Sequence, residues 1–299
     1  MSSIKNVTIA GGSGSLGSVI VEKLLATGKF NVRALRRPGS SATFPAGVDV
    51  VDVDFTSVSS LTPALQGQDA LIITTSSTAV KEQYPLIDAA VAAGVKRLLP
   101  SEFGSNLDNE KTRKLPLFAG KAEVAEYIVE KTKTSDLTYT SVYNNAFLDW
   151  GLQYDFILRI SDYQPVIIDD GNLPFSTTTL ATVAEAVAAI LSKPDETRNR
   201  SVFIHDLVTT QNELLALAKQ IAPEKPWKET HINLGEAVTD ALAKLSQGQV
   251  GLETLYPILW TGVMDPAYGG KFEKTDNELL GLKGKTEADI LAILKQFIK

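Results

Sequence analysis

Seven residues near the start of the chain have the types and spacing that bind phosphate groups. The segment GGSGSLG satisfies both the G-x-G-x-x-G and the G-x-x-G-x-x-G spacing, between an apolar run at 7–10 and a helical pattern at 16–26. Glycines permit a tight turn, let backbone amides approach a pyrophosphate, and allow a helix to pack closely on a strand. A Gly/Ser-rich loop without a ligand is the alternative. The context favours a dinucleotide site formed by Gly11, Gly12, Ser13, Gly14, Ser15, Leu16 and Gly17.

Two arginines at the end of the second predicted strand indicate which dinucleotide is bound. A chain that holds the ribose 2′-hydroxyl of NAD places an acidic residue about 20 positions after the glycines. This sequence has Arg36 and Arg37 there. A guanidinium suits a 2′-phosphate through charge-assisted hydrogen bonds, so the pair favours NADPH. The alternative is two solvated arginines at a strand end.

Lys121 is the candidate for proton transfer. It shares one face of a predicted helix, residues 120–133, with Ala125 and Ile128, whereas the glutamates of this helix lie on the opposite side. In the first turn, the positive helix end and partial burial would both lower the pKa of the lysine toward the range useful for proton transfer. The alternative is a stem that packs on the core while its ammonium reaches solvent.

A competing motif lies later in the same helix. Tyr127 and Lys131 spell the Y-x-x-x-K of ordinary short-chain dehydrogenases, in which the tyrosine donates the proton. That motif begins its helix, whereas these residues lie near the end of theirs. Leu117 stands four positions before Lys121, where a catalytic tyrosine would be expected. We therefore do not assign the chemistry to Tyr127.

The elements that position these residues alternate in type along the chain. Short β-branched runs alternate with longer helical stretches, which predicts an α/β fold with a doubly wound parallel Rossmann sheet and a second, smaller substrate-binding lobe. Strands are predicted at 7–10, 31–35, 48–53, 70–74, 97–100, 137–142 and 202–205, and helices at 16–26, 57–65, 83–93, 120–133, 180–191, 214–221 and 286–297. The dinucleotide domain is expected at 1–150, with 177–207 returning to it, and the smaller lobe at 151–176 and 208–299.

Composition excludes several classes of function. The chain has 299 residues, a net charge of −6 and no cysteine, so disulfides and thiolate metal sites are excluded and a reducing cytoplasm is expected. His205 and His231 have no metal-ligand spacing, and we predict no metal site. The scattered basic residues argue against nucleic acid as a partner. No apolar run has the length of a signal peptide or a membrane span, so we expect no membrane association.

Three segments together resemble a known family. With the glycine loop, LLPSEFG at 98–104 and NAF at 145–147, the chain resembles the NmrA-like, isoflavone-reductase-like branch of atypical short-chain dehydrogenases, which includes phenylcoumaran benzylic ether reductases and eugenol synthases. The resemblance implies that Gly11 to Gly17 hold the pyrophosphate, Arg36 the 2′-phosphate, and that Lys121 is the catalytic lysine. It also implies a cofactor cleft lined by Thr74, Thr75, Ser76, Ser101, Glu102, Phe103 and Gly104, with Asn145, Ala146 and Phe147 near the nicotinamide.

These observations lead to one expected function and one alternative. We expect an NADPH-dependent reductase of a small, aromatic molecule, in which Lys121 donates or relays a proton. The alternative is a non-enzymatic regulator of the NmrA type that senses the dinucleotide and binds a protein partner. The sequence leaves the substrate, the reduced bond and the oligomeric state open. Candidate pocket aromatics are Trp150, Tyr154, Phe156, Tyr256 and Trp260.

Overall fold

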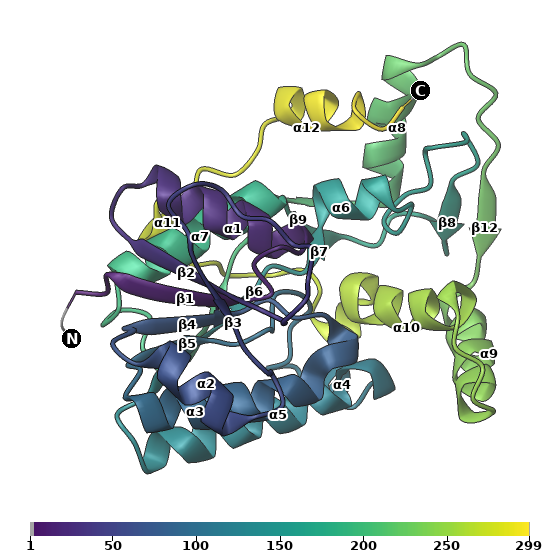
Figure 1. The fold of residues 1–299 in the computed structure, drawn as a ribbon. Coiled ribbons are helices and arrows are strands. Elements are labelled where there is room, and N and C mark those ends of the chain that lie inside the picture. The colour runs from purple at the N-terminus through teal and green to yellow at the C-terminus, as the bar shows by residue number, and fades with distance from the viewer. Residues whose placement is uncertain (1–2, 299) are drawn as a thin grey trace.

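The molecule is organised around a sheet of seven parallel strands. The computed structural model describes residues 3–298, without the side chains of residues 77 and 78. The strand order is β10-β6-β5-β4-β1-β2-β3 (Figure 1). The strands are β1 (Asn6–Ala10), β2 (Asn31–Arg36), β3 (Asp49–Asp52), β4 (Ala70–Ile73), β5 (Arg97–Leu99), β6 (Thr138–Tyr143) and β10 (Arg200–Phe203). The order reverses between β1 and β4, so the doubly wound Rossmann topology, including its seventh strand, is confirmed.

Helices cover both faces of this sheet (Figure 1). One face carries α1 (Ser15–Ala26), α7 (Leu180–Ser192) and α11 (Asn277–Leu280). The other carries α2 (Val58–Leu65), α3 (Gln83–Ala93) and α5 (Pro116–Lys133), with η1 (Ser77–Glu82) and α4 (Glu110–Arg113) beside them. Because the sheet is covered on both sides, its central strands are apolar at consecutive positions.

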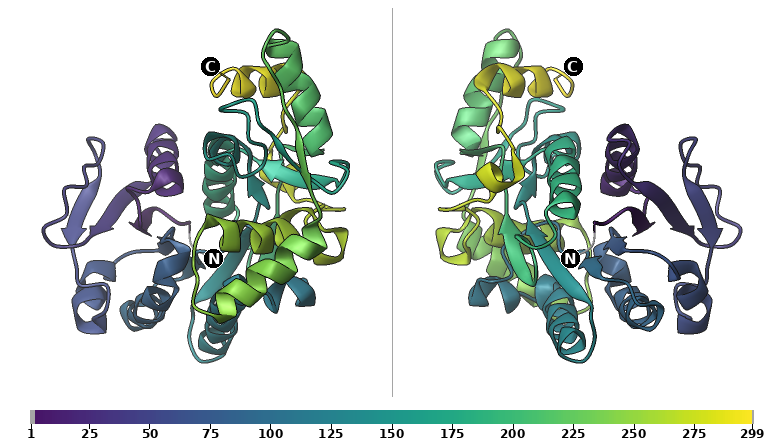
Figure 2. Two further views of the ribbon diagram at one scale, coloured as in Figure 1. Left: turned by 90° about the vertical axis from the view of Figure 1, so that its right-hand side faces the viewer. Right: turned by 90° about the vertical axis from the view of Figure 1, so that its left-hand side faces the viewer.

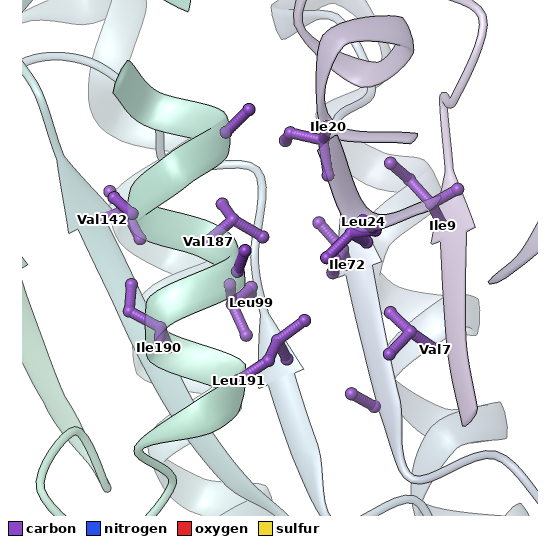
Figure 3. Packing of buried hydrophobic residues seen from close by; sticks show 14 of the residues in the cluster. Val7, Ile9, Ile20, Leu24, Ile72, Leu99, Val142, Val187, Ile190 and Leu191 are labelled. Atoms are coloured by element: carbon purple, nitrogen blue, oxygen red, sulfur yellow. The ribbon is translucent and has the colours of Figure 1, made fainter. Parts of the chain in front are cut away.

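Alternate residues of each central strand enter two separate apolar cores. Ile72 of β4 packs with α1 and α7, whereas Leu71 and Ile73 pack with α2 and α3. Figure 3 shows Ile72 beside Leu24 of α1, within the first of these cores. Burying such a side chain stabilises the fold by about 1.5 to 3 kcal/mol. The two cores fix the sheet, and with it the carboxyl ends of the strands.

One charged residue is built into the middle of the sheet. Arg97 of β5 is fully buried, and its guanidinium donates to the hydroxyls of Thr138, Thr140 and Thr197 and to the carbonyl of Pro194. Burial lowers the pKa of Arg97 to about 10, so it stays charged at neutral pH. These bonds join β5 and β6 to the loop that leads into β10.

Most of the remaining elements surround a third apolar cluster. They are β7 (Ala146–Phe147), α6 (Leu148–Gln153), β8 (Val166–Ile168), β9 (Phe175–Thr178), β11 (Leu207–Thr209), α8 (Gln211–Ile221), β12 (Thr230–Ile232), α9 (Leu234–Ser246), α10 (Leu252–Met264) and α12 (Glu287–Leu294), and η2 (Pro266–Tyr268) lies against α10. Strand β9 pairs with β7 and β11, and β8 pairs with β12. Figure 2 shows the green and yellow ribbons of the later part of the chain together on one side of the molecule. We propose the division expected from the sequence, with 1–150 and 177–207 as the dinucleotide domain and 151–176 and 208–299 as the smaller lobe.

Three predicted helix boundaries were wrong by three or four residues. Helix α5 begins at Pro116, four residues before the predicted start, because proline at the first helical position has a fixed φ that suits a helix. Helix α8 begins at Gln211, three residues before the predicted start, after a capping box formed by Thr210 and Glu213. Helix α12 ends at Leu294, three residues before the predicted Phe297. Among residues 3–298, no helix combines the length and apolar character of a membrane span.

Candidate active site

The glycine segment forms a turn with no room for a side chain at Gly11 or Gly17. Gly11 has a φ of +86°, and a Cβ there would lie 2.7 Å from the carbonyl oxygen of Thr74. A Cβ on Gly17 would lie 2.2 Å from the carbonyl oxygen of Gly11. The turn leads into α1, whose N-cap is Gly14 and whose first turn has no acidic residue. The first amides of α1 are therefore free of a side-chain cap and suited to a phosphate.

A cavity of about 340 Å³ opens beside this turn. It brings together five of the residues expected from the sequence, namely Gly11, Ser13, Arg36, Arg37 and Thr75. The hydroxyl oxygen of Thr75 is buried and has no hydrogen-bond partner among the described residues. A ligand with hydrogen-bonding groups would satisfy it, since buried polar atoms seldom stay unpaired. The glycine turn, the two cations and this hydroxyl fit the adenosine and phosphate end of a dinucleotide.

Both arginines at the rim of the cavity already have carboxylate partners. Arg36 binds Asp52 through two hydrogen bonds of 2.7 and 3.2 Å, and Arg37 binds Glu82 at 2.7 Å. The parallel register places Arg36 directly opposite Asp52. The hydrogen bond from Arg36 holds the pKa of Asp52 below its usual value. Sequence reasoning missed Asp52 and Glu82, because nothing in the sequence specifies the register of β2 on β3 or the packing of η1.

Lys121 lies close to the carboxyl end of β5. Its half-buried side chain donates from Nζ to the carbonyl oxygen of Glu102 at 2.7 Å. The neighbouring Ser101 donates from its hydroxyl to the carbonyl oxygen of Thr75, also at 2.7 Å. Lys121 is therefore linked to Glu102 by one hydrogen bond, and Ser101, the residue before Glu102, is linked to Thr75 by another. Thr75 lines the cavity.

The environment of Lys121 differs from the one expected. Because α5 starts at Pro116, Lys121 is the sixth residue of the helix, and the field of a helix end falls off within its first turn. Burial instead lowers the pKa of the amine, and the negative charge of Glu102 opposes this effect. The expected direction of the pKa shift holds, but the helix terminus is not its cause.

Glu102 is buried beneath this site. Its side chain is 1% exposed, and neither carboxylate oxygen has a hydrogen-bond partner among the described residues. Burial raises the pKa of the Glu102 carboxyl to about 7. The side chains of Ser101 and Phe103 are also nearly buried, each at 8% exposure. That Ser101 to Gly104 line the cofactor cleft stays a prediction. Gly104, Thr74 and Ser76 are at least partly accessible.

The expected nicotinamide segment has a structural function. Asn145 has a left-handed φ of 51°, and its buried side-chain amide donates to the carbonyls of Ser176, Val263 and Gly270. These bonds join β7, β9 and the end of α10, so the amide nitrogen is fully bonded within the protein. The buried amide oxygen has no hydrogen-bond partner among the described residues. The two residues after Asn145 form β7. Of the three, Phe147 alone has a partly accessible side chain.

The competing tyrosine faces another helix. Tyr127 donates from its hydroxyl to Asp88 of α3 at 2.6 Å, and its ring makes an edge contact with Tyr84. Lys131 forms an ion pair with the same Asp88. Both residues of the Y-x-x-x-K pattern thus join α5 to α3.

The candidate pocket aromatics contact one another between α6 and α10. Their rings meet at centroid distances of 4.8 to 6.5 Å, and they pack against the third apolar cluster. Trp260 donates from its indole nitrogen to the carbonyl of Phe156 at 2.7 Å. Tyr154, at 50% exposure, is the most accessible of the five. The other four belong to the third apolar cluster or pack against it.

The two histidines have separate surroundings. His205 lies 3.0 Å from the hydroxyl of Ser176, and His231 lies 3.0 Å from the carbonyl oxygen of Asp169. Within the described part of the chain, no group of three or more potential ligands could hold a metal ion.

Comparisons with known proteins agree with this geometry. A curated relative from Aspergillus flavus, "Oxidoreductase aprR", is 34% identical over 97% of this chain and 98% of its own length. "Pinoresinol reductase 2" from Arabidopsis thaliana is 26% identical and covers 96% of each chain. The NADPH complex of leucoanthocyanidin reductase from Vitis vinifera has a TM-score of 0.80 at 18% identity, over 98% of this chain and 99% of that one. This structural likeness shows the shared fold.

The family follows from the sequence match. A profile described as the NmrA-like family matches residues 3–245. The matched region contains the glycine turn, both rim arginines, Glu102 and Lys121. The resemblance inferred from three short segments is thus confirmed over most of the chain, and the protein belongs to the NmrA-like family.

Proposed function

We propose that this protein is an NADPH-dependent reductase of a small, aromatic molecule, with Lys121 as its proton donor or relay. One observation carries the proposal. The amine of Lys121 is held on the Glu102 carbonyl, and Ser101 connects that peptide to the Thr75 side of the cavity. A titratable group and a phosphate-binding turn thus meet at the carboxyl ends of the strands, where doubly wound sheets bind ligands.

The residues of the cavity would hold the cofactor in a defined way. The uncapped amides at the start of α1 would bind the pyrophosphate, and Arg36 and Arg37 would bind the 2′-phosphate. The hydroxyl of Thr75 would find its missing partner on the ligand. When bound, NADPH supplies a hydride.

Lys121 would supply the proton that accompanies this hydride. Transfer of a hydride to an electrophilic carbon leaves negative charge on the substrate, and a nearby acid neutralises it. The hydrogen bond to Glu102 orients the amine. Burial lowers the pKa of Lys121, which makes the ammonium a better proton donor.

The comparisons favour an enzyme over a non-enzymatic regulator. The relative from Aspergillus flavus, which matches nearly the full length, is named an oxidoreductase, and the one from Arabidopsis thaliana is named for its action on the aromatic compound pinoresinol. The leucoanthocyanidin reductase structure contains NADPH. These names support the proposed reaction, cofactor and substrate class. The absence of cysteine fits a location in the reducing cytoplasm.

A substrate panel tests this proposal. Aromatic ketones, enones and benzylic ethers are each mixed with the protein and NADPH, and cofactor oxidation is followed by absorbance. We expect at least one class to oxidise NADPH, and Lys121→Met to abolish most of that rate. Tight NADPH binding with no oxidation by any class would contradict the proposal and favour the regulator.

A further inference from the structure

The carboxyl group of Glu102 is in an unfavourable position for folding. It is 1% exposed, and neither oxygen accepts a hydrogen bond from a described residue. An unpaired buried carboxylate costs several kcal/mol, whereas an apolar side chain of similar size would cost nothing comparable. The position therefore calls for an explanation other than packing.

Three charged side chains affect the ionisation of the Glu102 carboxyl. Lys121 on α5 and Arg113 on α4 both favour the ionised carboxyl, whereas Asp108, in the segment before α4, disfavours it. The charge of Glu102 in turn contributes to raising the pKa of the Tyr143 phenol on β6. The carboxyl thus lies between two cations, a second carboxylate and a neutral phenol.

Of the two cations, Lys121 depends more on Glu102. Arg113 forms a 2.7 Å ion pair with Glu126. The ammonium of Lys121 instead donates to the uncharged backbone carbonyl of Glu102. Glu102 is also the one group whose charge opposes the effect of burial on the amine. One residue therefore contacts Lys121 through its carbonyl and affects its charge through its side chain.

We propose that Glu102 is a positioning residue for Lys121, whose buried carboxylate keeps the proton on the amine until the substrate takes it. The catalytic meaning rests on the proposed function, whereas the electrostatic link between the two side chains does not. Because the charge of each group affects the pKa of the other, the two groups titrate as a coupled pair. Neutralising the carboxyl would release the proton of Lys121 at lower pH, so less of the protein would be ready to donate.

The link can be measured without a substrate. Amine-reactive reagents attack the neutral amine, so the pH dependence of Lys121 labelling, read by peptide mass spectrometry, reports its protonation. Lys114, an exposed lysine nearby, is the internal reference. In Glu102→Gln we expect labelling of Lys121 relative to Lys114 at pH 8 to rise about tenfold, because the variant lacks the charge that opposes the effect of burial on the amine.

Matched variants separate charge from packing. Asp108→Asn removes a neighbouring carboxylate that also acts on Glu102, and should leave Lys121 labelling unchanged or slower. Glu102→Met keeps the size of the side chain and removes its polar atoms. It should fold with an unchanged or higher melting temperature, and label Lys121 as fast as Glu102→Gln does.

The outcomes distinguish this proposal from the proposed function. Faster Lys121 labelling in both Glu102 variants supports the link even if no substrate is ever found. Where turnover is measurable, the alkaline limb of kcat should also move to lower pH in Glu102→Gln. Folded Glu102 variants that label Lys121 at the rate of the unaltered protein would overturn the proposal, whatever the activity.

Discussion

The position of Lys121 on its helix predicted where its side chain lies, but not which groups surround it. Its side chain was expected to face inward, and the structure places it on the Glu102 carbonyl. The sequence prediction did not use Pro116 as the start of α5, although proline favours the first helical position, so the helix end was wrongly given a share in lowering the pKa of Lys121. Nor could it show that Glu102 is buried, because an acidic residue after a strand is usually solvated.

Lys121→Met tests the proposed chemistry at this residue. Methionine keeps the apolar stem and removes the ammonium, so the variant should fold and bind NADPH normally. Because a proton donor acts in the transition state, kcat should fall roughly 100-fold or more with little change in cofactor affinity. Near-normal turnover by this variant would reduce Lys121 to a packing residue.

Tyr127→Phe is the counterpart on the same helix. The phenol bonds to Asp88 of α3, so its loss should cost about 1 kcal/mol of stability and leave turnover unchanged. Urea unfolding and steady-state kinetics on one preparation give both values. If the phenol were the acid, turnover would fall about 100- to 10,000-fold, and the assignment to Lys121 would fail.

Among the elements, β2 and β3 together carry the residues of the proposed cofactor preference. The sequence predicted both strands and the arginines that follow the first. It did not predict that Asp52 would lie opposite Arg36, because register depends on tertiary packing. The carboxylate holds the guanidinium in place and would compete with a bound 2′-phosphate for it.

The variant Arg36→Gln tests whether Arg36 recognises the 2′-phosphate of NADPH. It should weaken NADPH binding about tenfold or more and leave NADH binding unchanged, because the amide cannot replace a charge-assisted pair on the 2′-phosphate. Arg33→Gln is the matched control. Arg33 pairs with Asp49 between the same two strands but does not line the cavity. Equal losses of NADPH affinity in both variants would show a structural effect on the strands rather than phosphate recognition.

At the scale of the whole molecule, the sequence predicted the dinucleotide domain better than the rest. The strands from β1 to β6 were expected within about two residues. The clearest of them is β4, a fully buried run of apolar residues. The smaller lobe has short strands such as β7 and β8, and contacts such as those of Asn145 span more than 100 positions. No local pattern specifies such contacts.

The buried carboxyl of Glu102 also affects global stability. Its pKa is raised from 4.5 to about 7, so between these values the folded protein keeps a proton that the unfolded chain has released. The free energy of unfolding therefore falls as the pH rises through this window, by about 3 kcal/mol in total. Glu102→Gln lacks this loss. Its stability relative to the unaltered protein, from urea unfolding, should be greater at pH 8 than at pH 4.5, and an equal difference at both would contradict the burial of an ionisable group.

The most direct test of the central claim is titration of the unaltered protein with NADPH and with NADH. Tryptophan fluorescence or calorimetry would follow binding at one salt concentration, because phosphate recognition depends on ionic strength. We predict that NADPH binds at least about tenfold more tightly, the effect of charge-assisted hydrogen bonds from the rim arginines to a 2′-phosphate. Equal affinity for the two cofactors, or no binding of either, would contradict the account.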